Sequence, residues 1–383
     1  MRTKIVILCI IGVFAAVFLL FAFMSEQSEQ FQLVPQKVQG DIVQTTEISG
    51  TEVGTGWSTN ENPIQAVKEA VSMALQGKAQ KKPDFAVIYA SSGSYTPAIL
   101  STAKELLGTD AKIFGGTSDS RAVMTDKGFI KVTERGYELA AMEGHKGLVI
   151  MTVTSKDIVF GVGSANLSEF TSPQEMSKAA VVRAIQNAGK TEDEPPRIVL
   201  ILLTLGIEDV ALEGIEEVLG RNVPVLGGTA GGPSGAAFGN NKVYHEGVSS
   251  AVIYTDLPLG WTYEGGFDVT DKHAGIVTKT QGPDIVEIDN RPALDVYDEW
   301  LAGEIKRLHN QHEEPDVIRD LLTLHPLYRR YTSTTGQDYF LFSHPWPKDS
   351  EMKDRCVSTS TKIKAGEKIY LSHGNWETFI NRI

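Results

Sequence analysis

One stretch of the sequence occurs twice. Residues 86–120 and residues 198–232 superpose with a constant shift of 112 and without a gap, so that Gly115-Gly116-Thr117 falls on Gly227-Gly228-Thr229. The apolar positions in between also coincide, at the spacing of one face of a 3.6-residue helix. Each copy therefore predicts a strand, a loop, an amphipathic helix that ends at glycine, a second strand and a Gly-Gly-Thr turn. This duplication constrains the fold more than any other feature of the chain.

The duplicated unit extends beyond this match. In each copy a Gly-x-Gly segment precedes a helix that begins at proline and ends before glycine, at residues 63–76 and 173–188. Each copy also closes with a strand that follows a glycine. Because such a unit is longer than a solenoid repeat, we predict one domain made of two halves, residues 45–153 and 154–255, about a pseudo-twofold axis. Alternating strands and helices predict the α/β class.

From residue 256 onward the pattern changes. It predicts a strand at 285–288, a helix at 292–308 and, after a charged loop-like stretch, strands at 339–342, 357–363 and 368–371. We therefore predict a second, smaller domain of mixed α and β structure over residues 256–383. An apolar helical face that starts at Asn375 stops after about two turns, so we expect this domain to be incomplete.

The N-terminus predicts where the protein is located. Residues 5–24 are uncharged and largely apolar, and a helix of this length spans about 30 Å, the thickness of a bilayer core. Arg2 and Lys4 precede the run, which predicts a cytoplasmic N-terminus and an extracytoplasmic remainder. We predict a single-pass membrane anchor at residues 1–24 and a flexible linker at 25–44. The alternative is a cleaved signal peptide, which would release a secreted or periplasmic protein.

Composition excludes some partners. The net charge is −12, which argues against nucleic acid, because that partner needs a basic face. The two cysteines, Cys9 and Cys356, provide neither a disulfide framework nor a thiolate metal cluster. We expect Cys356 to be a buried or incidental thiol.

The order of the segments resembles one known family. The duplicated unit, the Ala-Ser-Ser-Gly-Ser-Tyr loop at 90–95 and the closing strands resemble the N-terminal half of a FIST domain. Residues 282–294 and 364–371 resemble its C-terminal half, so the resemblance covers about 45–372. It implies a sensory, small-ligand-binding module of signal transduction, with amino acids as a proposed ligand class and a haem-binding branch. The chain differs in its membrane anchor and in having no attached signalling module, so we expect a separate signalling protein as a partner.

Differences between the two copies predict a ligand site. Before its helix the first copy has an uncharged hydroxyl-rich loop, whereas the second has Glu208 and Asp209. Backbone N–H groups at a helix start favour an anion, so the first copy offers a vacant anion site and the second fills its own. If the loops meet, a zwitterion would place its carboxylate on the first loop and its amine near Glu208 or Asp209. The alternative is that these residues only cap their helices.

Two further features extend the predicted site. The Gly-Gly-Thr segments are either turns whose exposed backbone lines a pocket or tight turns that need a positive φ. Arg121 has no charged counterpart in the second copy and is a candidate anion partner. The predicted ligand-binding residues are Ser91, Ser92, Ser94, Tyr95, Gly115, Gly116, Thr117, Ser118, Arg121, Glu208, Asp209, Gly227, Gly228 and Thr229.

Catalytic and metal-binding motifs are missing from the sequence. Ser91 and Ser92 do not lie in a Gly-x-Ser-x-Gly nucleophile elbow, and His309 and His312 fit a polar helix end better than a metal site. We therefore predict a protein that is not an enzyme and needs no metal or cofactor. A hydrolase-like enzyme that uses the Ser91–Ser94 loop is one alternative. A haem-based gas sensor is another, with His245 as the candidate ligand.

Overall fold

The computed structural model describes residues 50–78, 82–91, 97–118, 122–125, 128–131, 147–204, 207–231, 235–261, 266–311, 315–332, 338–347, 354–359 and 361–374. These residues form two compact units, which divide between Gly260 and Trp261. The predicted anchor and linker lie outside the described residues. Within the described part of the chain, no helix is long and apolar enough to cross a membrane.

The first unit contains two sheets with the same strand order. The first sheet begins with β1 (Thr51–Ser58), β6 (Leu148–Ser155), β2 (Phe85–Ser91) and β3 (Lys112–Ser118). The second sheet consists of β7 (Ile158–Asn166), β12 (Gly247–Thr255), β8 (Ile198–Leu203) and β9 (Val225–Thr229). Only β2 with β3 and β8 with β9 are parallel pairs; the other pairs in these sheets are antiparallel. The common order confirms the duplicated α/β fold.

Helices cover the outer face of each sheet. They are α1 (Pro63–Ala74) and α2 (Pro97–Leu107) in the first copy and α4 (Pro173–Asn187) and α5 (Glu208–Leu219) in the second, with a short 3-10 turn η2 (Leu167–Glu169) before α4. The predicted start signals are confirmed, because Asn62 caps α1 and Ser172 caps α4, each directly before a proline. The predicted ends lie within two residues of the observed ones.

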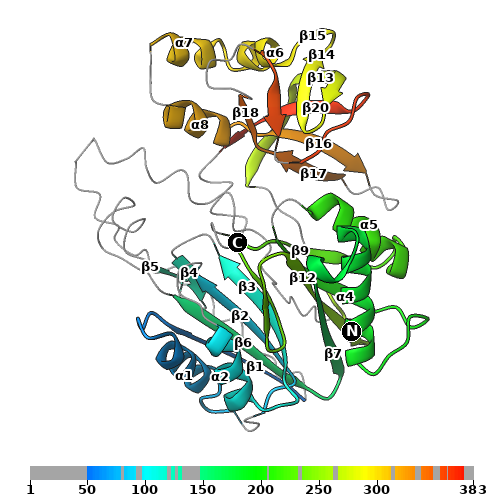
Figure 1. Cartoon of the computed structure of the whole chain (residues 1–383). Helices are drawn as coiled ribbons and strands as arrows, with labels where there is room; N and C mark the ends of the chain where they lie inside the picture. Colours follow the sequence, from blue (N-terminus) through cyan, green and yellow to red (C-terminus); the bar gives the residue numbers. More distant parts are fainter. Residues whose placement is uncertain are drawn as a thin grey trace, which may run out of the picture. The chain divides into compact units, whose positions relative to one another are not determined.

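The two sheets pack face to face. Apolar side chains from both inner faces form one core, in which the rings of Phe85 and Phe160 stack at 4.6 Å between their centres. Two further cores lie between each sheet and its own helices. The first unit therefore has four layers: helices, sheet, sheet, helices (Figure 1).

The gap-free superposition of the copies is wrong by one residue in the first strand. Ala90 pairs with Thr117 across β2 and β3, whereas Leu203 pairs with Thr229 across β8 and β9. Ala90 therefore corresponds to Leu203, a shift of 113, while Thr117 keeps the shift of 112 to Thr229. The loop after the strand is one residue shorter in the second copy. Because side chains alternate along a strand, this correction moves every side chain of β8 to the opposite face from the one predicted.

The Gly-Gly-Thr segments are not turns, as the sequence predicts, but the ends of strands β3 and β9. After each of them comes a hairpin. In the first copy β4 (Ala122–Thr125) and β5 (Gly128–Lys131) form a two-stranded sheet of their own. In the second copy β10 (Ala237–Gly239) and β11 (Lys242–Tyr244) cross over and extend the first sheet at β3. One hairpin thus crosses from the second copy to the sheet of the first.

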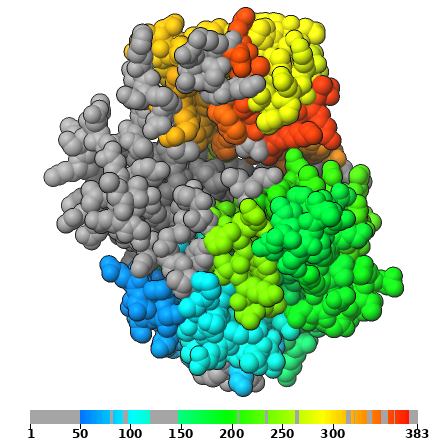
Figure 2. Space-filling view, viewed as in Figure 1, coloured from blue at the N-terminus to red at the C-terminus, as the bar shows by residue number. Residues whose placement is uncertain are grey.

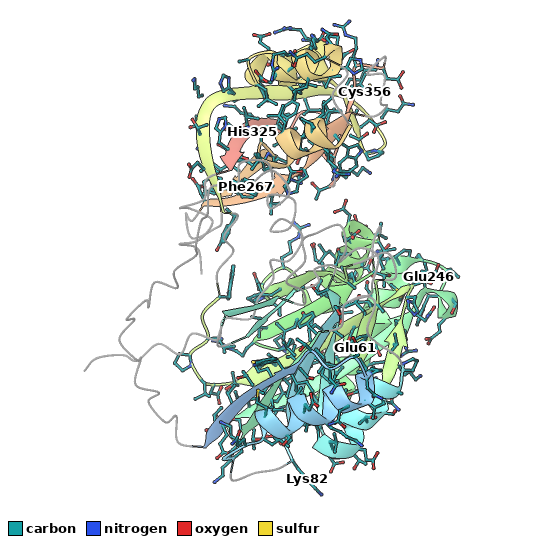
Figure 3. The ribbon with its side chains drawn as sticks, turned by 90° about the vertical axis from the view of Figure 1, so that its left-hand side faces the viewer. Glu61, Lys82, Glu246, Phe267, His325 and Cys356 are labelled. Atoms are coloured by element: carbon teal, nitrogen blue, oxygen red, sulfur yellow. The ribbon has the colours of Figure 1, made fainter. Side chains whose placement is uncertain are left out.

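The second unit is a mixed α and β domain. Its sheet has the order β17 (Asp338–Ser343), β16 (Leu327–Thr332), β20 (Lys368–Gly374), β13 (Phe267–Gln281), β14 (Asp284–Ile288), β19 (Val357–Thr359) and β18 (Pro345–Pro347), and β15 (Arg291–Pro292) also pairs with β14. Three helices, α6 (Ala293–Trp300), α7 (Glu304–Asn310) and α8 (Pro315–Thr323), accompany the sheet. The apolar core joins side chains of the sheet and the helices. Figure 3 labels His325 and Cys356 in this unit.

Two expectations for this region are corrected and one is confirmed. The single helix at 292–308 is two helices, because Gly303 takes a left-handed conformation (φ 82°) between them. The charged loop-like stretch contains α8 and β16, whose short apolar patterns are hidden among charges. The thiol of Cys356 is buried, as expected.

Candidate functional site

The predicted site residues gather where the parallel strands end. In α/β sheets the carboxyl ends of parallel strands are the usual place for ligands. In the first copy these ends are Ser91 and Ser118, which are neighbours in register and both buried. In the second copy they are Leu203 and Thr229.

At the end of β2 and of β8, a residue with a hydroxyl group forms two hydrogen bonds with the glycine at the start of the neighbouring strand. The Ser91 N–H donates to Gly147 O (2.9 Å), and the Gly147 N–H donates to Ser91 Oγ (3.0 Å). Thr204 forms the same pair with Gly247, at 3.0 Å and 2.9 Å. The sequence predicts that the Ser91 hydroxyl contacts a ligand. In the structure it accepts a hydrogen bond from the backbone of Gly147, just as the Thr204 hydroxyl accepts one from Gly247.

Thr117 joins the two copies. Its N–H donates to Ala236 O (2.9 Å), and its carbonyl accepts from the Gly231 N–H (3.0 Å). Its hydroxyl donates to Gly231 O (2.8 Å) and accepts from the Ala236 N–H (2.9 Å). The segment that follows β9 thus seals the end of β3. Figure 2 shows the yellow-green surface around β10 and β11 beside the cyan surface of the first copy.

The glycines of the first copy are required by close contacts. A Cβ on Gly115, whose φ is +145°, would lie 1.9 Å from Ile88 O. A Cβ on Gly116 would lie 2.2 Å from Leu202 Cδ2 and 2.4 Å from Ala236 O. In the second copy Gly227 (φ +153°) has the same contact as Gly115, with Ile201 O at 1.8 Å. Gly115, Gly116 and Gly227 therefore allow a close approach inside a sheet, and neither Gly-Gly pair forms a turn.

The corresponding edge of the second copy is open. Gly227, Gly228 and Thr229 are exposed, whereas Gly115, Gly116 and Thr117 are buried. The Thr229 hydroxyl donates to Glu208 Oε1 (2.8 Å), which fixes that carboxylate at the end of β9. Helix α5 begins here with Glu208 and Asp209 in its first turn and with no side-chain cap from Ile207. The second edge therefore combines accessible backbone, a hydroxyl and two carboxylates.

The structure brings part of the predicted site together. Gly231 contacts Thr117 and lies two residues after Thr229, so the ends of β3 and β9 are close in space. Ser91, Thr117 and Ser118 lie at the first edge, and Glu208 and Thr229 lie at the second. The remaining predicted loop residues, Ser92, Ser94, Tyr95 and Arg121, lie outside the described part of the chain.

Two groups at the same edge of the first sheet were not predicted. Tyr89 is the one aromatic hydroxyl in strand Phe85–Ser91, and burial raises its pKa to about 12. Its counterpart in the second copy is Leu202, so the copies differ here as well. The Glu69 carboxylate accepts from Ser58 Oγ (2.5 Å) and Asn60 Nδ2 (3.0 Å) beside an open hollow of about 400 Å³. A polar residue within an apolar strand is the signal that identifies Tyr89 in the sequence.

The residues that the sequence suggested for haem or metal binding do not form a site among the described residues. His245 is exposed between β11 and β12. Among the described residues, no group of three or more histidine, cysteine or acidic side chains is arranged to hold a metal ion. His312 lies outside the described residues.

The sequence matches the FIST N domain over residues 84–291, which is more than half of the chain. The chain belongs to the FIST N domain family. The family is one of sensory domains, which agrees with the sensory role implied by the sequence. The FIST match begins one residue before β2 and includes both strand edges, Tyr89, Glu208 and Thr229. The candidate site is therefore built from the part of the chain that carries the family signature.

Other comparisons place few constraints on this FIST protein. A cyanuric acid hydrolase from A. caulinodans is 11% identical over 75% of this chain and 82% of its own, with a TM-score of 0.30. The synthase FabH from Pseudomonas aeruginosa PAO1 is 12% identical over 54% of this chain and 99% of its own, with a TM-score of 0.24. No curated protein matches the chain. At such scores the solved structures support no conclusion about activity.

Proposed function

We propose that this FIST protein is a sensory module that binds a small polar ligand with an amino group, such as an amino acid, at the carboxyl end of β9. One observation carries the proposal. The two copies have the same strands and helices, yet the Gly-Gly-Thr segment is exposed to solvent only in the second copy. The same backbone that is sealed at Thr117 is accessible at Thr229. The features that the two copies share reflect the fold, so a difference between them is a better indication of a functional site.

The chemistry of the open edge favours an ammonium group. The Glu208 carboxylate is half-buried and held by Thr229, and Asp209 is exposed beside it. Hydrogen bonds from an ammonium to a fixed carboxylate are charge-assisted and stronger than neutral ones. The sequence predicts that the carboxylate of the ligand lies on the Ser91–Tyr95 loop of the first copy, of which residues 92–95 lie outside the described residues.

Substitution of the two acids tests this assignment. We expect Glu208→Gln with Asp209→Asn to weaken the binding of a zwitterionic amino acid by at least about tenfold, because a charge-assisted hydrogen bond contributes about 1.5–3 kcal/mol. A thermal-shift screen of the purified full-length chain against amino acids and small carboxylates would find the ligand, and calorimetry would measure its affinity.

The matched control is Glu213→Gln, an exposed acid farther along the same helix. Equal affinity of the double variant and the control would remove the proposed site. Stabilisation by carboxylates without an amino group, and not by amino acids, would contradict the proposed ligand class.

A further inference from the structure

The hollow beside Glu69 has a counterpart in the second copy, and close contacts of two glycines fix the correspondence. A Cβ on Gly56 would lie 1.9 Å from Ala70 O, and a Cβ on Gly163 would lie 2.2 Å from Ala180 O. Strand β1 therefore meets α1 in the same way as β7 meets α4. Counting from these contacts, Trp57 corresponds to Ser164, Glu69 to Ala179 and Met73 to Arg183.

In the second copy a guanidinium group occupies this place. Arg183 Nη1 donates to Ser164 O (2.8 Å), and Arg183 Nη2 donates to Glu169 Oε2 (3.0 Å). The guanidinium carbon also lies 5.6 Å from the centre of the Phe170 ring. A planar guanidinium carries five N–H donors, so it can contact a backbone carbonyl and a carboxylate at the same time. The second copy thus supplies its own cation at the edge of β7.

The first copy has a hollow in place of this cation. Met73, the counterpart of Arg183, is uncharged and 39% exposed. The hollow has a volume of about 400 Å³, and none of the residues that line it is basic: they are Trp57, Ser58, Thr59, Asn60, Glu69 and Met73. A hollow of this size has room for a small molecule.

The Glu69 carboxylate gives the hollow a fixed negative charge. It accepts hydrogen bonds from Ser58 Oγ (2.5 Å), Asn60 Nδ2 (3.0 Å) and Gln65 Nε2 (3.2 Å). These bonds, the one from Ser58 most of all, lower the pKa of the Glu69 carboxyl. All three donors are neutral, and a carboxylate can accept about four hydrogen bonds, so one site remains for a charged donor. The carboxylate is therefore held in position without a cation among the described residues.

The backbone of β1 offers a second acceptor. Strand β1 lies at the outer edge of the first sheet. Val53 O on this edge accepts a hydrogen bond from Lys78 Nζ. Alternate carbonyl groups of a strand point to the same side, so Trp57 O also points outward from this edge. It has the place that Ser164 O has in the second copy, where the acceptor receives Arg183.

We infer that the hollow in the first copy binds a small molecule with a guanidinium group, which takes the place that Arg183 has in the second copy. The N–H groups of the ligand donate to Glu69 Oε2 and to Trp57 O, and its apolar part lies toward Met73. Hydrogen bonds between a guanidinium and a fixed carboxylate are charge-assisted. This site lies on β1 and α1, so it is separate from the proposed amino-acid site and goes beyond the proposed function.

Ligand-observed NMR on the full-length chain tests the site with methylguanidinium as the probe. Methylurea is the matched control, because it has a similar size and shape but no charge. We expect saturable binding of methylguanidinium and at least tenfold weaker binding of methylurea. Absence of saturable binding, or equal binding of the two compounds, would overturn the inference.

Two substitutions locate the binding. We expect Glu69→Gln to weaken the binding of methylguanidinium at least tenfold, because it removes the charge of the acceptor. Met73→Arg should abolish binding, because the new guanidinium would fill the hollow as Arg183 does. The controls are Met73→Gln and, for the loss of an acid, Glu105→Gln at an exposed position of α2. Both controls should bind as the wild type does.

Met73→Arg keeps the test decisive if Glu69→Gln does not fold, because residue 73 is exposed on its helix. Binding by Met73→Arg with the affinity of the wild type would overturn the inference. Glu208→Gln with Asp209→Asn should leave the binding of methylguanidinium unchanged, and its loss in that variant would place the binding at the other site. A capped arginine peptide that bound more than tenfold tighter than methylguanidinium, with this gain lost in Glu69→Gln, would overturn the assignment to a small molecule.

Discussion

Single hydroxyl groups hold the ends of the parallel strands. Ser91 and Thr204 are different residues at equivalent positions, and each receives the N–H of the glycine that opens the closing strand. A buried N–H without an acceptor is costly, which explains why both copies keep a hydroxyl here. Ser249 and Ser250 on β12 show the opposite case, since their hydroxyls are fully buried and have no hydrogen-bond partner among the described residues.

Removal of these two kinds of hydroxyl should have different effects on stability. We expect Thr204→Val to lower the free energy of unfolding by about 1–3 kcal/mol, because it leaves the Gly247 N–H buried and unpaired. Ser250→Ala removes a hydroxyl that has no partner and should change the stability by less than about 0.5 kcal/mol. Urea unfolding of both variants measures the difference. Equal effects of the two substitutions would contradict the role assigned to Thr204.

At the scale of elements, the crossing hairpin is a structural part of the first sheet. Phe238 on β10 comes from the second copy, yet its ring lies in the core between the first sheet and α1 and α2, with no exposed surface. The halves are therefore interlocked at this point, because a residue of the second half completes the core between the first sheet and its helices.

Removal of this side chain tests the interlock. We expect Phe238→Ala to destabilise the first unit by about 3–5 kcal/mol, because it removes a buried ring and leaves a cavity. Val159→Ala on β7, a residue that is 43% exposed, should change stability by less than about 0.5 kcal/mol. If denaturant unfolding gave similar midpoints for both variants, the hairpin would be an accessory and not a part of the core.

At the scale of the whole molecule, we expect the two units to differ in their response to acid. Three histidines of the second unit have lowered pKa values. Burial lowers the pKa of His325, and the neighbouring His373 ring, whose Nδ1 is 3.0 Å from His325 Nδ1, lowers it further. Burial also lowers the pKa of His344. For His373 burial acts first and His273 and Lys272 add to it, while Asp268 opposes them.

The sign of the effect follows from proton binding. A histidine whose folded pKa lies below its ordinary value of 6.5 binds fewer protons in the folded unit than in the unfolded chain. Its contribution to stability is fully present above about pH 6.5 and is lost as the pH falls below that value. We expect the second unit to unfold at a lower temperature at pH 5.5 than at pH 7.5, with the larger shift of the two units.

Calorimetry at the two pH values, with limited proteolysis to assign each transition to a unit, measures this. His325→Asn with His344→Phe should reduce the pH dependence of the second unit. An equal shift of both transitions, or an unchanged slope in the double variant, would show that other groups control the response to acid.

The sequence by itself determined the duplication, the α/β class, the helices of the first unit and the family, because apolar periodicity and helix punctuation are local properties. It also predicted that the ligand site lies where the two copies differ. It did not determine the register of β8, because a one-residue change in a loop leaves the local pattern intact.

Only the tertiary structure decided that the Gly-Gly-Thr segments end strands, that Ser91 and Thr117 serve the frame, and that the hairpin of the second copy completes the first sheet. These features depend on contacts between residues that are about 50 to 120 positions apart in the chain. Such contacts bring together backbone groups that every residue carries, so they leave no specific signal in the sequence. The open edge at Gly228 and Thr229 therefore becomes visible only when the two copies are compared in space.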